Sequence, residues 1–204
     1  VGFVRHFHER DMPADPEVAA ALERAASVLE TAGASVRAVE LPPLGQFAAV
    51  NRIILQAEAW AVHADWLRTR PQDYAKLTRQ RLLAGAFLTA EDYIQAQRRR
   101  HRMIAAVERT FRDVDLLLCA SAMDPPCRVD DATAIARTYP RQARTPFNVT
   151  GHPALAMMSG LSAGGLPLSL QLVGRYWDEA TVLRAAEVFE RETAFHRAHP
   201  PAFA

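Results

Sequence analysis

The stretch Thr145-Pro146-Phe147-Asn148-Val149-Thr150-Gly151-His152-Pro153-Ala154 leads into two apolar runs, at 154–159 and 166–174, separated by a glycine-rich turn. Its first proline can preset the first turn of a short helix, its glycine can end that helix, and its second proline prevents the helix from continuing. Two apolar runs joined by so short a turn predict a pair of neighbouring strands.

The first forty residues predict a strand, a helix and a second strand. Gly2–Arg5 is the first strand, and a helix follows from Pro16 to Thr31, with Asp15 as its N-cap. Gly33 stops this helix, and Ser35–Leu41 is the second strand. A strand, a helix and a strand with short connections form a βαβ unit, so part of the sheet should be parallel.

The remaining elements complete an α/β pattern. Val114–Cys119 is an uninterrupted apolar run, which is typical of a strand buried on both faces. Ala120–Tyr139 contains Pro125-Pro126 and predicts an irregular segment. The predicted helices are Leu44–Leu67, Pro71–Ala84, a helix opened by a capping box at Thr89 and ending at about Arg112, and Asp178 to about Phe195. We therefore expect one α/β domain over 1–204, with a mixed β-sheet flanked by helices.

The composition is that of a globular protein that binds neither nucleic acid nor a membrane. Half of the 204 residues are hydrophobic, 23% are charged, and the formal net charge is +1. The basic run Arg98–Arg102 lies in a helical pattern and is interpreted as a solvated helix face. No apolar stretch approaches the length of a membrane span. The chain begins at Val1, which indicates an upstream cut or boundary.

Cysteine usage favours a reducing compartment. Only Cys119 and Cys127 occur, and Cys119 ends an apolar run in which a buried thiol is expected. A disulfide between the two remains open, but nothing implies a disulfide framework, so the cytoplasm is the simpler expectation.

Several segments together resemble the amidase signature family, serine hydrolases that cleave carboxamides. Thr145–Asn148 and the run Gly165–Gly174 are the most specific of them. The other matching segments are Asp15–Val18, Gly33–Val36, Leu41–Pro43, Arg81–Gly85, Leu88–Tyr93 and Asp113–Leu118. Ala120-Ser121 stands where the family usually has Pro-Thr. The resemblance implies that 1–204 is the C-terminal portion of the amidase-signature fold, whose catalytic N-terminal half is absent from this sequence.

The resemblance also implies which chemistry this chain lacks. The family uses a serine nucleophile, a second serine that relays the proton through a cis peptide bond, and a lysine base. This chain has one lysine, Lys76, in a charged helical context, and six serines of which no two are adjacent. We therefore expect no catalytic residue, no metal and no cofactor in this chain, and no activity of the chain alone.

Four residues are implied to contact the amide substrate in the intact protein. Family resemblance suggests that Arg81, Thr145 and Asn148 approach the acyl part of the substrate. Asn148 lies in an apolar context, so it should either bond to the backbone, which is the favoured interpretation, or line a pocket. Arg141 falls where tRNA-amidotransferase subunits carry an acidic residue that holds glutamine. The arginine disfavours a glutaminase and favours an anionic or neutral carboxamide.

Two other functions remain open from the sequence. The chain could be a non-catalytic binding or assembly module that acts with a partner chain, and an exposed sheet edge could support a homodimer. Alternatively, Gly160–Gly164 matches G-x-S-x-G, with Asp178 and His196 following Ser162 in the order of an α/β-hydrolase triad. However, Ser162 precedes another strand rather than a helix, which predicts a hairpin turn instead of a nucleophile elbow.

A metal site is the weakest of the motifs. His6-x-His8 could hold a metal from one strand face, but no third ligand is evident in the sequence, so a surface pair is the favoured interpretation.

Overall fold

The computed structural model describes residues 1–199. Its strands form one five-stranded sheet in the order β2-β1-β3-β5-β4. The strands are β1 Gly2–Phe3, β2 Arg37–Ala38, β3 Leu116–Ala120, β4 Ala154–Leu161 and β5 Pro167–Gly174. β1 pairs in parallel with β2 and β3, whereas β5 pairs antiparallel with β3 and β4. The prediction of a mixed sheet that begins with a parallel βαβ unit is confirmed.

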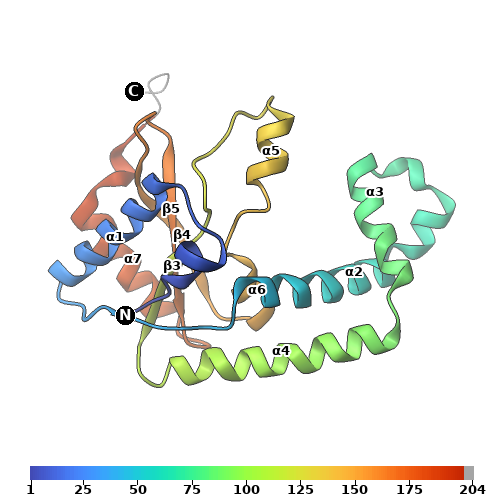
Figure 1. The fold of residues 1–204 in the computed structure, drawn as a ribbon, viewed down its shortest axis with the longest axis horizontal. Helices are drawn as coiled ribbons and strands as arrows, with labels where there is room; N and C mark the ends of the chain where they lie inside the picture. Colours follow the sequence, from blue (N-terminus) through green and yellow to red (C-terminus); the bar gives the residue numbers. More distant parts are fainter. Residues whose placement is uncertain (200–204) are drawn as a thin grey trace.

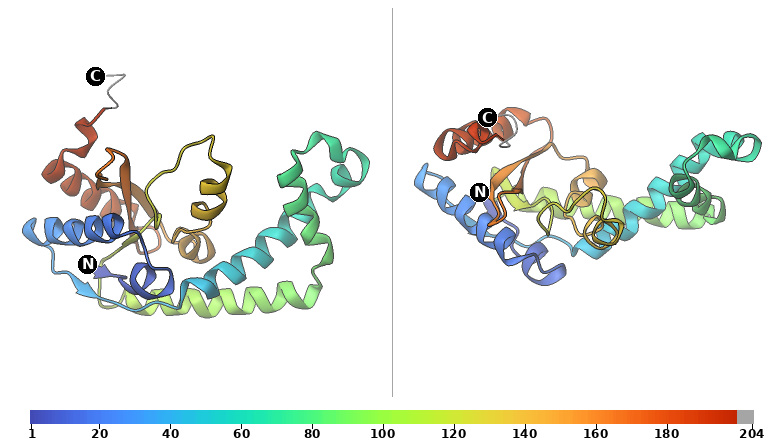
Figure 2. Two further views of the ribbon diagram at one scale, coloured as in Figure 1. Left: turned by 45° about the horizontal axis from the view of Figure 1, so that its top comes forward. Right: turned by 90° about the horizontal axis from the view of Figure 1, so that it is seen from above.

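Helices cover the sheet and extend away from it. They are α1 Pro16–Thr31, α2 Leu44–Thr69, α3 Lys76–Leu83, α4 Ala90–Thr110, α5 Ala132–Thr138, α6 Thr145–Thr150 and α7 Glu179–Thr193. α1 and α7 lie together against one face of the sheet (Figure 1). α2 and α4 run side by side as a long arm that carries α3 at its far end (Figure 2). None of the helices within 1–199 is long and apolar enough to cross a membrane.

Side-chain caps fix where the helices begin. Asp15 accepts a hydrogen bond from the amide of Glu17, and Pro16 occupies the first position of α1. Thr89 and Asp92 form a reciprocal capping box at the start of α4. Each cap satisfies amide groups that the helix itself leaves free, which contributes about 1 kcal/mol per cap. These helix starts agree with the sequence.

The core lies between the sheet and its helices. β3 is buried along its whole length, and its register places Leu117 beside Val173 of β5. The largest fully buried side chains include Phe3 of β1, Leu22 of α1 and Phe189 of α7. Burying a side chain of this size contributes about 1.5–3 kcal/mol. The same cluster includes residues from the first turns of α2 and the last turns of α4, so it fixes the base of the arm.

The arm leaves this core after about two turns of α2. Beyond Val50, α2 buries only Leu67, and Val62 and Trp66 are exposed. Gly85, in the 3₁₀ turn Ala84–Phe87, allows the returning chain to pass directly against α2. The arm is thus held mainly by contacts among its own helices.

Several local expectations were wrong. The predicted second strand, 35–41, shortens to β2. The predicted helix 71–84 divides into the 3₁₀ turn Pro71–Asp73, α3 and the 3₁₀ turn that follows it. The segment 120–139 contains α5, whose first turn is capped by Asp131. The predicted first strand ends at Phe3 and gives way to a π-helical turn at Phe7–Asp11.

Candidate functional site

The site that the sequence indicates is built on an extension of β3. After β3 ends, the amide of Ala143 donates to Ser121 O at 3.0 Å, and the amide of Met123 donates to Arg141 O at 3.0 Å. Gln171 of β5, which is buried, donates from Nε2 to Ala143 O at 3.3 Å. The segment 141–143 is therefore fastened to the end of the sheet, immediately before α6.

α6 presents two polar side chains above an apolar base. Pro146 and Phe147 are buried, whereas Thr145 is half-buried and Asn148 is exposed. Residues three apart share one face of a helix, so Thr145 and Asn148 lie side by side. Within 1–199 the Asn148 side chain has no hydrogen-bond partner, so the interpretation that it bonds to the backbone is wrong. Its amide is free to bind a ligand.

Gln142 fixes the beginning of α6. Its Nε2 donates to the Thr145 hydroxyl at 2.8 Å, and its Oε1 accepts from the amide of Arg144 at 2.6 Å. The Thr145 hydroxyl is thereby oriented by a neighbour that no motif in the sequence singles out.

The end of α6 is held from two other parts of the chain. Gly151 takes a left-handed conformation, φ 81°, and its amide donates to Phe147 O at 2.7 Å. Arg100 of α4 donates from Nε to Val149 O at 2.7 Å, and the Tyr176 hydroxyl donates to Thr150 O. Carbonyls that end a helix need such partners, so α6 is fixed at both ends. Arg100 is the half-buried member of the basic run, whose other residues are exposed as expected.

His152 joins these two parts. Its ring stacks on Tyr176 with centroids 4.2 Å apart and on Phe111 at 5.3 Å. Nδ1 lies 2.8 Å from the Thr150 hydroxyl and Nε2 lies 2.7 Å from a carboxylate oxygen of Glu108. Burial lowers the pKa of His152 and outweighs Glu108, which acts in the opposite direction. The imidazole is therefore a neutral brace near neutral pH, a role that the sequence does not reveal.

Arg141 forms a partly buried ion pair. Its Nε donates to Asp124 Oδ2 at 2.6 Å, and its Nη2 donates to Pro13 O at 2.7 Å. The exposed fractions are 32% for the arginine side chain and 14% for the aspartate. Arg141 thus ties the loop before α6 to the segment that precedes α1.

Arg81 does not join the other three predicted residues. Arg141, Thr145 and Asn148 lie within one ten-residue segment, whereas Arg81 is exposed on α3. Both orientations place α3 at the far end of the arm, away from α6 (Figures 1 and 2). The structure therefore brings together three of the four residues.

Ser162 has a structural role in this chain. It lies in the turn between β4 and β5, where its hydroxyl accepts a hydrogen bond from the amide of Leu166 at 3.0 Å. Asp178 caps the start of α7 through Thr181, and His196 follows the end of that helix. A helix of 15 residues is about 22 Å long. Asp178 and His196 therefore cannot both reach Ser162.

The remaining reactive groups are buried or exposed away from α6. Cys119 and Cys127 are both free, and burial raises the pKa of the Cys119 thiol to about 12. Lys76 is exposed at the start of α3. His6 and His8 are both buried, so the expected surface pair is wrong. The ring of His6 accepts from the amide of Leu41 at 3.1 Å.

Comparisons with known proteins agree with this arrangement. The family model Amidase matches residues 1–183. An amidase of Pseudomonas putida is 36% identical over 194 residues, which are 91% of this chain and 41% of that protein. A glutamyl-tRNA(Gln) amidotransferase protein of Rhodospirillum rubrum is 32% identical over 231 residues, which cover all of this chain and 45% of that protein.

Solved structures share the fold. A crystal structure of an amidase superposes with a TM-score of 0.78 at 28% identity, covering 93% of this chain and 44% of the other. A 6-aminohexanoate cyclic dimer hydrolase has a TM-score of 0.82 at 21% identity, covering all of this chain and 47% of the other, which supports the fold alone.

The mixed sheet and its helices thus define an α/β protein of the amidase class. The chain belongs to the amidase signature family. It spans somewhat less than half the length of the relatives that it matches.

Proposed function

We propose that this chain is the C-terminal part of an amidase and that it forms one wall of the pocket for a carboxamide. Its family membership is consistent with amide hydrolysis. The reaction requires a nucleophile, and Ser162, the only serine in a hydrolase-like motif, is occupied in a hairpin turn. We propose that the nucleophile and its base come from residues outside these 204, and that the chain alone is inactive.

The observation that carries the proposal is the state of α6. Backbone and side-chain hydrogen bonds fix both of its ends, yet the Asn148 amide has no partner within residues 1–199. A polar side chain on a rigid support suits ligand binding, because little conformational freedom is lost when the ligand binds. We assign Thr145 and Asn148 to the acyl side of the pocket.

Arg141 and Arg81 have different places in this proposal. The ion pair with Asp124 leaves Arg141 as a positive charge close to α6, which supports an anionic or neutral amide over a glutaminase role. Arg81 lies on the arm, so its contact with substrate requires a ligand or a neighbouring segment that reaches α3.

Steady-state kinetics of the intact protein that carries this chain would test the proposal. Asn148→Ala should lower kcat/KM by about three- to tenfold, because one hydrogen bond contributes about 0.5–1.5 kcal/mol. Arg144→Ala is the matched control, since Arg144 is exposed beside α6. If kcat/KM is the same for both variants and the unmodified protein, α6 is not part of the pocket.

A second candidate is a non-catalytic assembly module. The exposed apolar side chains of the arm, among them Val62, Trp66 and Phe87, favour it because such side chains commonly mark contacts with another protein surface. Sizing chromatography distinguishes the two candidates. A stable monomer supports an independent module, whereas dimers or aggregates support a part of a larger fold.

A further inference from the structure

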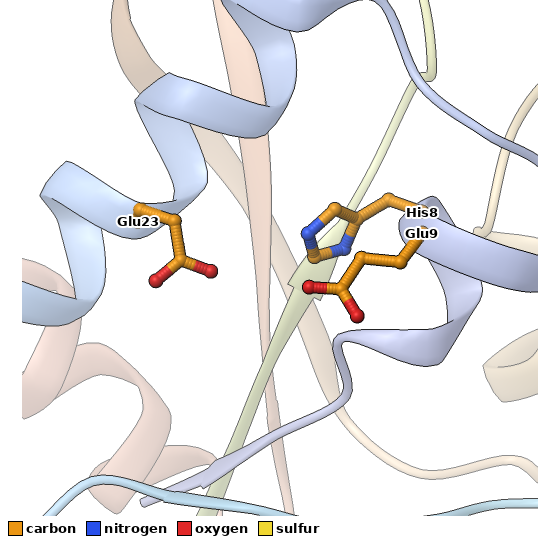
Figure 3. Close-up of side chains that lie close together, drawn as sticks. All are labelled: His8, Glu9 and Glu23. Atoms are coloured by element: carbon orange, nitrogen blue, oxygen red, sulfur yellow. The ribbon is translucent and has the colours of Figure 1, made fainter.

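Three side chains converge beside the first strand, on the opposite side of the molecule from the arm. His8 and Glu9 lie in the π-helical turn after β1, and Glu23 lies in the middle of α1. One ligand atom from each lies within 4.8 Å of the other two. Figure 3 shows the His8 ring directed toward the carboxylate of Glu23, with the Glu9 carboxylate next to the same ring.

His8 is the unusual member of this group. The residue is 2% exposed, and its Nδ1 is buried without a hydrogen-bond partner within residues 1–199. A buried polar group left unpaired costs about 1–3 kcal/mol. Burial lowers the pKa of His8, which keeps the ring neutral and its lone pair available. An imidazole in this state, aimed at two carboxylates, has the character of a metal ligand.

Glu23 is already oriented for such a role. Arg5 donates from Nε and Nη2 to the two carboxylate oxygens, each at 2.8 Å. A carboxylate offers about four lone-pair positions, so this pair leaves others free. Carboxylates that bind metals are commonly held by hydrogen bonds of this kind. Two carboxylates and one guanidinium leave a net negative charge, which favours a divalent cation.

We propose that His8, Glu9 and Glu23 form a binding site for a divalent transition-metal ion, represented by Zn²⁺. One imidazole nitrogen and two carboxylate oxygens match the ligands that zinc takes in proteins, with a fourth position open to water. π-Helical turns are frequent at functional sites, and here the turn brings together two adjacent residues that an α-helix would direct apart. The site is separate from α6 and does not depend on the proposed amidase function.

Isothermal titration calorimetry of the untagged 204-residue chain with Zn²⁺ would test this site. We expect one ion per chain, with affinity reduced by at least about tenfold in Glu23→Gln and in His8→Ala. Glu23 is exposed, so the first variant should fold even if the second does not. Circular dichroism would verify the fold of each variant.

The matched control is the double variant His196→Ala/His199→Ala, which removes two histidines near the end of the chain. It should leave the affinity unchanged. Binding of Co²⁺ in place of Zn²⁺ should give visible absorption bands that Glu23→Gln weakens. Absence of saturable binding, or binding that depends on the control histidines and is unaffected by Glu23→Gln, would overturn the proposal.

Discussion

The ion pair between Arg141 and Asp124 gives the sharpest stability prediction. Arg141→Ala removes a charge-assisted bond of 2.6 Å to Asp124 and a bond of 2.7 Å to Pro13 O. It also leaves the Asp124 carboxylate, which is 14% exposed, without its partner. Hydrogen bonds to charged groups contribute about 1.5–3 kcal/mol, whereas fully exposed ion pairs contribute under about 1 kcal/mol. We expect a loss of about 2–3 kcal/mol in the free energy of unfolding.

Urea unfolding followed by circular dichroism would measure this loss. Arg144→Ala is the control, because its side chain is exposed three residues away, and it should change the free energy by less than about 0.5 kcal/mol. A double-mutant cycle with Asp124→Asn should give a coupling of about 1 kcal/mol or more. If Arg141→Ala behaves like the control, or if the coupling is absent, the bond does not hold this loop.

Two further predictions concern a buried histidine and a close helix contact. Because burial lowers the folded-state pKa of His152, the free energy of unfolding should fall as pH drops below about 6.5. His152→Gln should reduce that slope in urea titrations at several pH values, whereas a variant at the exposed His101 that leaves the slope unchanged serves as control. Gly85→Ala would drive a Cβ into the backbone oxygen of Gln56 and should cost about 1–3 kcal/mol by thermal unfolding. Gly45→Ala meets open space and should not destabilise, so equal effects at both glycines would refute the packing argument.

Much of the fold follows from local sequence. Asp15 with Pro16 and the Thr89 capping box each mark a helix start at the residue where the structure has it. The apolar run at Val114–Cys119 corresponds to a strand that is buried throughout. Caps and apolar runs act over a few residues, so their consequences can be predicted without the tertiary structure.

Contacts between distant residues cannot be predicted in this way. His152 and Glu108 are 44 residues apart and Arg141 and Asp124 are 17 apart, and each pair depends on how the elements pack. The π-helical turn that follows β1 has no simple sequence pattern, so the sequence favours a surface position for a histidine that the fold buries. α5 escapes prediction although Asp131 is an ordinary N-cap, because the prolines before it indicate an irregular segment.

The candidate site is predictable in part. The sequence directs attention to Thr145 and Asn148, and the structure places both on one rigid helix. The residues that support α6 carry no such signal, because Gln142, Arg100 and Tyr176 act through hydrogen bonds to α6 and the residues beside it.

This chain belongs to the amidase signature family but, in our proposal, carries no nucleophile of its own. Labelling the purified chain with a fluorophosphonate probe, followed by peptide mapping, tests this most directly. We expect no adduct, because the Ser162 hydroxyl is engaged in the β4–β5 turn and neither end of α7 supplies it with a complete triad. A stoichiometric adduct on Ser162 would contradict the proposal and make this chain a serine hydrolase in its own right.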